Sequence, residues 1–181
     1  MGILNGSSTS KERRLMMPKV TSYISIENAR IGFRNFSGRA NTYNAEGQRN
    51  FCVFLDDDLA EELAADGWNI RFPKNKTEDD TRQPFLQVSI KFDPYPPNIN
   101  MVTASKGTVK LDETNVGLLD DADIENVDIR IRPYNWTLQD GRSGVKAYVK
   151  DMYVTIQEDP FASKYYKRED NFDDLDDIPF K

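Results

Sequence analysis

The sequence predicts a mainly β protein, an antiparallel barrel with long, bulged strands and one short helix. Three observations predict it. Apolar and polar residues alternate in several short segments, which is the periodicity of half-buried strands. In the two longest segments the apolar residues change parity partway, which indicates a β-bulge, a device by which small barrels turn corners. One segment, 59–65, carries the flanking signals of a helix.

The first predicted strand begins near Val20. Its apolar residues lie on one parity in 24–26 and on the other in 29–33, so we expect a bulge near Glu27-Asn28. A turn-rich loop with two glycines, 35–48, follows.

The next strand, 49–55, is apolar on both parities, which is typical of a central, buried strand. Three aspartates, 56–58, then precede the helix, where negative charge is favourable, and Gly67 is well placed to end it. Further strands are expected at 68–72, 85–92, 99–104 and 108–111. Segment 116–125 is either a helical turn or an irregular connection.

The longest predicted element is a hairpin over 127–156. Apolar residues alternate through 127–131 and again through 145–149, and the loop between the arms contains two glycines. The return arm changes parity after Lys150, which predicts a second bulge. Many short strands, bulged long strands and one helix after an early central strand favour an oligonucleotide-binding (OB) barrel, with a β-sandwich as the alternative.

Composition excludes several kinds of site. The chain contains no histidine and a single cysteine, Cys52, so His-based triads, Cys/His zinc sites and an intrachain disulfide are excluded. The lone cysteine fits a reducing compartment, and no apolar run reaches membrane-spanning length. We therefore expect a cytoplasmic protein with no membrane partner and no cofactor.

The net charge of −6 is concentrated at one end of the chain. Residues 169–181 contain six acidic residues and one lysine, a net charge of −5, which leaves −1 for residues 1–168. Any basic groove must therefore be a local feature of a nearly neutral body. The polar face of the hairpin offers one, because it interleaves cations with Tyr148, a combination that suits single-stranded nucleic acid. The alternative is an ordinary solvated sheet face.

The end of the sequence resembles the acidic C-terminal tip of bacterial single-stranded DNA-binding proteins. DDLDDIPF combines an aspartate run with Ile-Pro-Phe, and in that family this tip recruits replication, recombination and repair proteins. Lys181 follows Phe180 here, whereas the family ends on the phenylalanine carboxylate. The resemblance implies a partner-binding set of Asp173, Asp174, Asp176, Asp177, Ile178, Pro179 and Phe180.

The body of the chain, roughly 20–158, resembles phage-encoded OB-fold single-stranded DNA-binding proteins. The resemblance lies in ISIENARIGFRNF, NFCVFLDD, DGWNI, IRPYNW and VKAYVKDMYVTI. It implies sequence-independent binding of single-stranded DNA in phage replication or recombination, in the cytoplasm of a bacterial host. We therefore expect three parts: a flexible arm at 1–17, an OB-like DNA-binding domain at 18–158, and a linker with an acidic partner-binding tail at 159–181.

Candidate DNA contacts are aromatic rings, on which bases stack, and cations, which pair with phosphates. We look for both on solvent-exposed strand faces and in loops. The expected set is Arg34, Phe36, Arg39, Tyr43, Arg49, Lys91, Tyr95, Arg130, Arg132, Lys146, Tyr148 and Lys150. Phe36 has an alternative place in the core. Trp68, Tyr134 and Trp136 are weaker candidates. If Leu138 pairs with Val145, Trp136 faces the core, which is the preferred interpretation.

Other function classes are weighed against DNA binding. An enzyme is not expected, because the Asp56–Asp58 run is better explained as a helix cap, the Asp120-Asp121 pair as a turn, and Cys52 as packing. A β-barrel interaction or virion structural protein with an acidic ligand tail is the remaining alternative. A homo-oligomer is possible.

Overall fold

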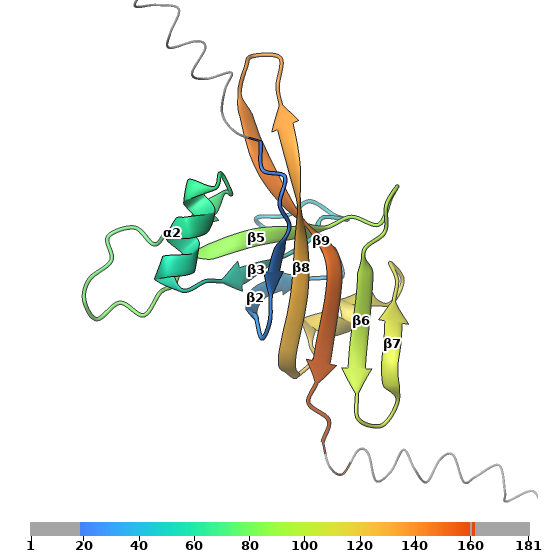
Figure 1. Ribbon diagram of the computed structural model, residues 1–181. Coiled ribbons are helices and arrows are strands. Elements are labelled where there is room, and N and C mark those ends of the chain that lie inside the picture. Colours follow the sequence, from blue (N-terminus) through green and yellow to red (C-terminus); the bar gives the residue numbers. More distant parts are fainter. Residues whose placement is uncertain (1–18, 160, 162–181) are drawn as a thin grey trace, which may run out of the picture.

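The computed structural model describes residues 19–159 and 161. The predicted N-terminal arm and acidic tail lie outside these residues. The chain folds as a mainly β, OB-like structure, which confirms the predicted fold class (Figure 1). Its elements are β1 (Ile24–Ile26), β2 (Arg30–Asn35), β3 (Arg49–Phe54), α2 (Asp57–Ala65), β4 (Ile70–Arg71), β5 (Phe85–Ile90), β6 (Asn98–Thr103), β7 (Gly107–Leu111), the 3-10 helix η1 (Val116–Asp120), β8 (Ile124–Thr137) and β9 (Ser143–Ile156).

One sheet contains all of these strands. Its main path runs β1-β8-β9-β5-β3-β2, with β4 on β5 and the β6–β7 hairpin on β9. Most neighbours are antiparallel, but β9 runs parallel to both β5 and β6. The ladder is not continuous around a cylinder, although its two ends, β1 and β2, are consecutive in the chain. The Ala29 N–H between them donates to the Val127 carbonyl of β8 (2.7 Å), so one bent segment bridges the two edges.

The bulge predicted in the long hairpin is present. Arg130 pairs with Asp151 while Ile131 pairs with Val149, so Lys150 is the extra residue. This bulge allows β9 to line the core on one parity and then on the other. Near Glu27-Asn28, where the sequence predicts a bulge within one long strand, the chain instead divides into two strands, β1 and β2, and Asn28 adopts a left-handed conformation (φ 50°). In Figure 1 the tip of the β8–β9 hairpin projects beyond the body of the barrel.

The core lies inside the curved sheet. Its largest fully buried side chains include Phe36, Phe51, Leu55, Ile131 and Met152. The predicted short helix is α2, which buries Ala60 and Leu63 against this core on one flank of the molecule. Asp56 is its N-cap but makes no side-chain cap hydrogen bond, so the aspartates act through their charge at the helix start. None of the described helices is long and apolar enough to cross a membrane.

The hairpin register differs from the expected one. Trp136 pairs with Gly144 and Tyr134 with Lys146, because the loop closes earlier, with the Leu138 N–H donating to the Arg142 carbonyl (2.7 Å). The shift relative to the expected Leu138–Val145 pairing is three residues. An odd shift moves every side chain to the opposite face of the sheet. Trp136 and Tyr134 therefore face outward, and the preferred core position for Trp136 is wrong.

Candidate nucleic-acid interface

One row of side chains crosses the outer face of the sheet. Residues paired directly on neighbouring strands point to the same face. Asn50 pairs with Ser89, Ser89 with Tyr148, and Tyr148 with Arg132, so these four residues form a line across β3, β5, β9 and β8. The inward neighbours Val88, Ala147 and Ile131 are buried, which confirms that the row lies on the side away from the core.

The same face carries a groove of about 460 Å³. Its floor comes from β3, β5 and β9, and the loop between β2 and β3 forms one wall. Its aromatic and cationic lining residues are Tyr43, Arg49, Arg71, Lys91, Trp136, Lys146 and Tyr148. The remaining polar lining is largely amide side chains, among them Asn44, Asn50, Asn69 and Gln87.

Tyr148 is the centre of an aromatic and cationic cluster. The Arg132 guanidinium lies 4.8 Å from the centroid of the Tyr148 ring, and the Lys146 ammonium lies 5.3 Å from it. Tyr134 meets the same ring edge-on, at 6.0 Å and 80°. Cation–π and edge-to-face contacts of this kind are attractive and favour this arrangement of the ring and the cations. The cluster offers a flat apolar surface beside positive charge, which suits a ligand with aromatic rings and negative groups.

Trp136 extends this aromatic surface toward the tip of the hairpin. Its indole covers Gly144 on the neighbouring strand, so close that a Cβ at position 144 would lie 2.6 Å from Cζ2. Glycine is therefore needed opposite Trp136, because any side chain would displace the ring. The indole remains partly exposed and lines the groove.

The loop between β2 and β3 is held at its base by Asn35. The Asn35 side chain donates to the carbonyls of Arg39 and Gln48 and accepts from the Arg39 N–H, all at 3.0–3.1 Å. Farther out, Tyr43 is 92% exposed at the groove wall. This arrangement fixes the two ends of the loop and leaves an aromatic ring at its tip accessible to a ligand.

Arg49 is a partly shielded cation at the edge of the groove. It pairs with Glu113 (Nη1–Oε1 3.3 Å), and its guanidinium lies 5.7 Å from the centroid of the Phe92 ring. Its Nε is buried and makes no hydrogen bond to the described part of the protein. Glu113 offsets part of the positive charge that Arg49 would present to a ligand.

The structure gathers five of the expected site residues in the groove: Tyr43, Arg49, Lys91, Lys146 and Tyr148. Arg132 lies directly beside them, over Tyr148. Arg39, Tyr95 and Lys150 are exposed but do not line the groove.

Arg130 lies in a different, acidic environment. It pairs with Asp151 (3.4 Å) in a shallow depression that Glu27 and Asp128 also line. These carboxylates repel phosphates, so this end of the outer face is unfavourable for a polyanion.

Two expected site residues have other roles. Phe36 is fully buried and stacks on Phe51, with ring centroids 5.0 Å apart, so its alternative place in the core is the correct one. Arg34 donates to the carbonyls of Leu119 and Ala122, both at 2.8 Å, and so fastens β2 to the end of η1. Both residues lie at the start of a loop that the sequence predicts to be exposed. The Phe36 ring is instead buried in the core, and Arg34 instead satisfies two carbonyls that would otherwise lack a hydrogen-bond donor.

Sequence reasoning missed part of the outer face. Arg71 was not considered, although it lines the groove. Phe54 and Phe85 pair directly on this face and are not fully buried, whereas the apolar pattern of 49–55 had indicated burial on both sides. The available signal was Gly32 in the preceding strand, since a glycine inside a strand often marks a bulge or a site of close approach.

The described residues show no constellation for metal or thiol chemistry. No group of three or more potential metal ligands occurs among them. Burial raises the pKa of the Cys52 thiol, so the thiol stays protonated and weakly reactive at neutral pH.

No curated protein matches the sequence. A single-stranded DNA-binding protein from bacteriophage Enc34 is similar in structure, with 10% identity and a TM-score of 0.49 over 77% of this chain and 83% of that one. The same phage protein in complex with single-stranded DNA gives 11% identity and a TM-score of 0.49 over 77% and 89%.

A family model gives a more extensive match. The model described as a putative phage ssDNA-binding domain matches residues 16–178, which is most of the sequence. The expected resemblance of the body to phage single-stranded DNA-binding proteins is thereby confirmed. The chain belongs to the family of putative phage ssDNA-binding domains.

Proposed function

We propose that this protein binds single-stranded DNA without sequence preference, on the outer face of β3, β5, β9 and β8. The observation that carries the proposal is the Tyr148 cluster, in which one ring is held against two cations and joined by Tyr134. Bases stack on such rings whatever their identity, and the cations neutralise the adjoining phosphates. Membership of the family supports the same ligand.

The geometry favours single strands over duplex. Tyr148 and Trp136 are only partly exposed on the floor of a groove whose wall carries Tyr43. Stacking on such rings requires the flat face of a base, and in a duplex that face is covered by the neighbouring base pairs. A strand with unpaired bases can turn them into the groove while its phosphates remain near Lys146 and Lys91.

We further propose that the acidic tail recruits replication or recombination proteins. Residues 169–181 lie outside the described residues, so the proposal rests on their sequence. Ile178, Pro179 and Phe180 beside a run of aspartates suit a hydrophobic pocket rimmed by Lys and Arg on a partner. A body spanning 18–158 with a tail from 159 would separate DNA binding from partner binding, in the cytoplasm of the host.

Titration of the full chain with oligo-dT and with duplex DNA of equal length tests the binding function. We expect binding of oligo-dT and little binding of duplex at the same salt concentration. Three to five phosphate contacts predict a slope of log K against log salt of about −2 to −3.5, since each neutralised phosphate on a single strand contributes about −0.7. Equal affinity for the two DNAs would contradict the proposal.

A further inference from the structure

Three phenylalanines form an exposed cluster beside the groove. The rings of Phe33 and Phe54 lie 6.2 Å apart at 54°, and those of Phe54 and Phe85 lie 6.4 Å apart at 69°. Phe33 is 76% exposed, and the other two are partly exposed. Water solvates a group of large apolar rings poorly, and such a group at the surface is typical of a binding site.

The cluster belongs to the same face as the groove. Phe54 pairs with Phe85, and two residues farther along the same strands Cys52 pairs with Gln87, which lines the groove. Arg71, another lining residue, pairs with Phe85 on the other side. The groove and the phenylalanine cluster (Phe33, Phe54 and Phe85) are therefore parts of one continuous surface.

The local backbone is arranged so that these rings stay at the surface. A Cβ on Gly32 would lie 2.6 Å from Cε2 of Phe54, so glycine makes room for that ring across β2. Phe33 has φ +48°, a left-handed conformation that a bulky residue rarely adopts, where the β2–β3 register shifts. The Phe33 ring points outward, so packing in the core does not offset the free-energy cost of this strained backbone.

The positions of the cluster fit successive bases of one strand. The separation between Phe54 and Tyr148 has two components. Across the sheet, β3 lies two strands from β9, about 10 Å; along β3, Phe54 lies four residues, about 13 Å, from Asn50, which is in the same row as Tyr148. A few nucleotides span this separation, within the roughly 4–16 nucleotides that one OB fold covers. Arg30, which pairs with Phe54, and Arg71, which pairs with Phe85, supply positive charge beside the rings.

We propose that the phenylalanine cluster is a second base-stacking site for the same DNA strand that occupies the groove. This inference rests on the proposed function and names a part of the path that the groove does not include. The strand runs from Trp136 and Tyr148 across the sheet to Phe54 and Phe33. Continuity with the groove and the two adjoining arginines favour DNA over an apolar protein partner.

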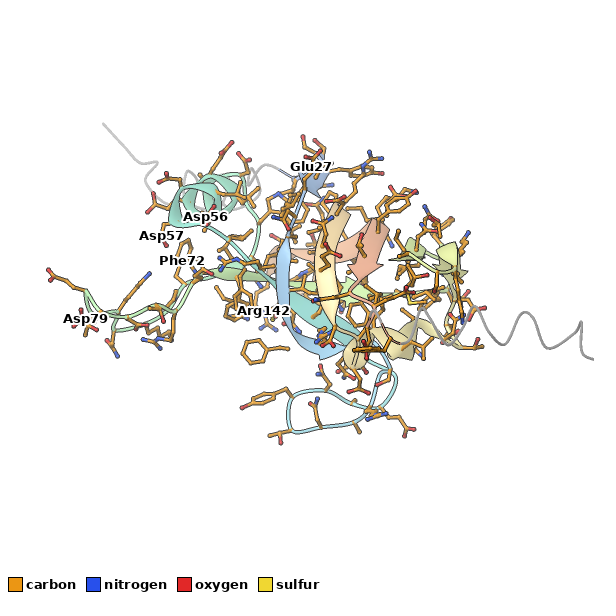
Figure 2. The ribbon with its side chains drawn as sticks, turned by 90° about the horizontal axis from the view of Figure 1, so that it is seen from below. Glu27, Asp56, Asp57, Phe72, Asp79 and Arg142 are labelled. Carbon is orange, nitrogen blue, oxygen red and sulfur yellow. The ribbon has the colours of Figure 1, made fainter. Side chains whose placement is uncertain are left out.

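Phe33→Ala in the full chain tests this inference, because Phe33 is exposed and contributes no core packing. Phe72→Ala is the matched control. Phe72 is another exposed phenylalanine (46%) that makes none of the ring contacts of the cluster, and Figure 2 labels it in the region of Asp56 and Asp57. Affinities for oligo-dT of increasing length are measured for both variants and for Trp136→Ala, together with the sedimentation of each free protein.

We expect Phe33→Ala to weaken binding of long oligo-dT about five- to tenfold, the effect of losing one stacked base, while Phe72→Ala binds like the parent. Phe33→Trp should restore the affinity. If Trp136→Ala weakens binding but Phe33→Ala matches Phe72→Ala, the second site is wrong and the groove remains. If neither Trp136→Ala nor Phe33→Ala affects binding, the proposed function on this face also fails. A Phe33→Ala variant that changes sedimentation but not DNA affinity would assign the cluster to contacts between copies and overturn the inference.

Discussion

The indole of Trp136 covers Gly144 so closely that the two positions must be considered together. A Cβ on Gly144 would meet Cζ2, Cε2 and Nε1 of Trp136 at 2.6, 2.9 and 3.1 Å. The glycine therefore determines where the ring lies, and the ring in turn forms part of the groove.

Gly144→Ala should displace the indole without unfolding the hairpin, since position 144 does not have a left-handed backbone. We expect oligo-dT affinity to fall about three- to tenfold, which is part of the stacking contribution of one base. Fluorescence anisotropy measures the affinity, and Ser143→Ala, at the exposed end of the same strand, is the control. An affinity equal to that of the control would show that the position of the indole does not matter for binding.

The cations around Tyr148 should contribute to affinity rather than to stability. Arg132→Ala and Lys146→Ala each remove one cation from the ring, and we expect each to weaken binding about three- to tenfold at low salt. Tyr148→Ala should weaken it further, by up to about 3 kcal/mol, because the stacking surface is lost. Circular dichroism confirms folding. Lys110→Ala, on the separate β6–β7 hairpin, is the control and should leave binding unchanged. If Lys110→Ala weakens binding as much as Arg132→Ala and Lys146→Ala do, the effect of the cations is only non-specific electrostatics.

Much of the fold is predictable because it depends on local patterns. Alternation located nearly every strand, and the parity change after Lys150 located the bulge that the pairing of Ile131 with Val149 confirms. Boundaries were less accurate: the strand expected at 68–72 shrinks to Ile70–Arg71, and the ambiguous segment 116–125 contains η1. Trp68 is buried in the core, so its weak candidacy as a DNA contact is not supported by its position.

The site is less predictable, because it depends on pairing between distant strands. The face of Trp136 follows from the length of the hairpin loop, and a difference of three residues in register was enough to reverse it. Arg34 reads as a free cation until the carbonyls of Leu119 and Ala122 are brought beside it by tertiary structure. Single-sequence periodicity contains no information on either contact.

Arg34 should therefore affect stability and not DNA binding. Arg34→Ala leaves two carbonyls without their charged donor, and we expect a loss of about 2–3 kcal/mol in the free energy of unfolding. For a chain of this size this corresponds to a decrease in melting temperature of about 5–10 °C. Differential scanning calorimetry measures the change, with the exposed Arg39→Ala as the control. A stable Arg34→Ala variant with weakened DNA binding would place Arg34 back at the interface.

Deleting residues 169–181 should tighten DNA binding. The segment carries a net charge of −5 beside a body at −1, and a tethered acidic segment competes for a cationic groove at a high effective concentration. The gain should be largest at low salt, where screening is weakest. Oligo-dT affinities of the full chain and of a chain ending at Arg168, compared at low and high salt, measure it. Equal affinities at low salt would reject competition and leave partner recruitment as the remaining role of the tail.

The central claim is that single-stranded DNA occupies the outer face beside Trp136 and Tyr148. A Trp68→Phe variant tests it most directly, because Trp68 is buried and its removal leaves Trp136 as the one tryptophan of the chain. Its fluorescence is followed during titration with oligo-dT and with duplex of equal length. The account predicts saturable quenching by oligo-dT, with the midpoint set by the binding constant, and little change with duplex. Binding of oligo-dT at the parent affinity with no change in Trp136 fluorescence would contradict it and place the DNA on another surface.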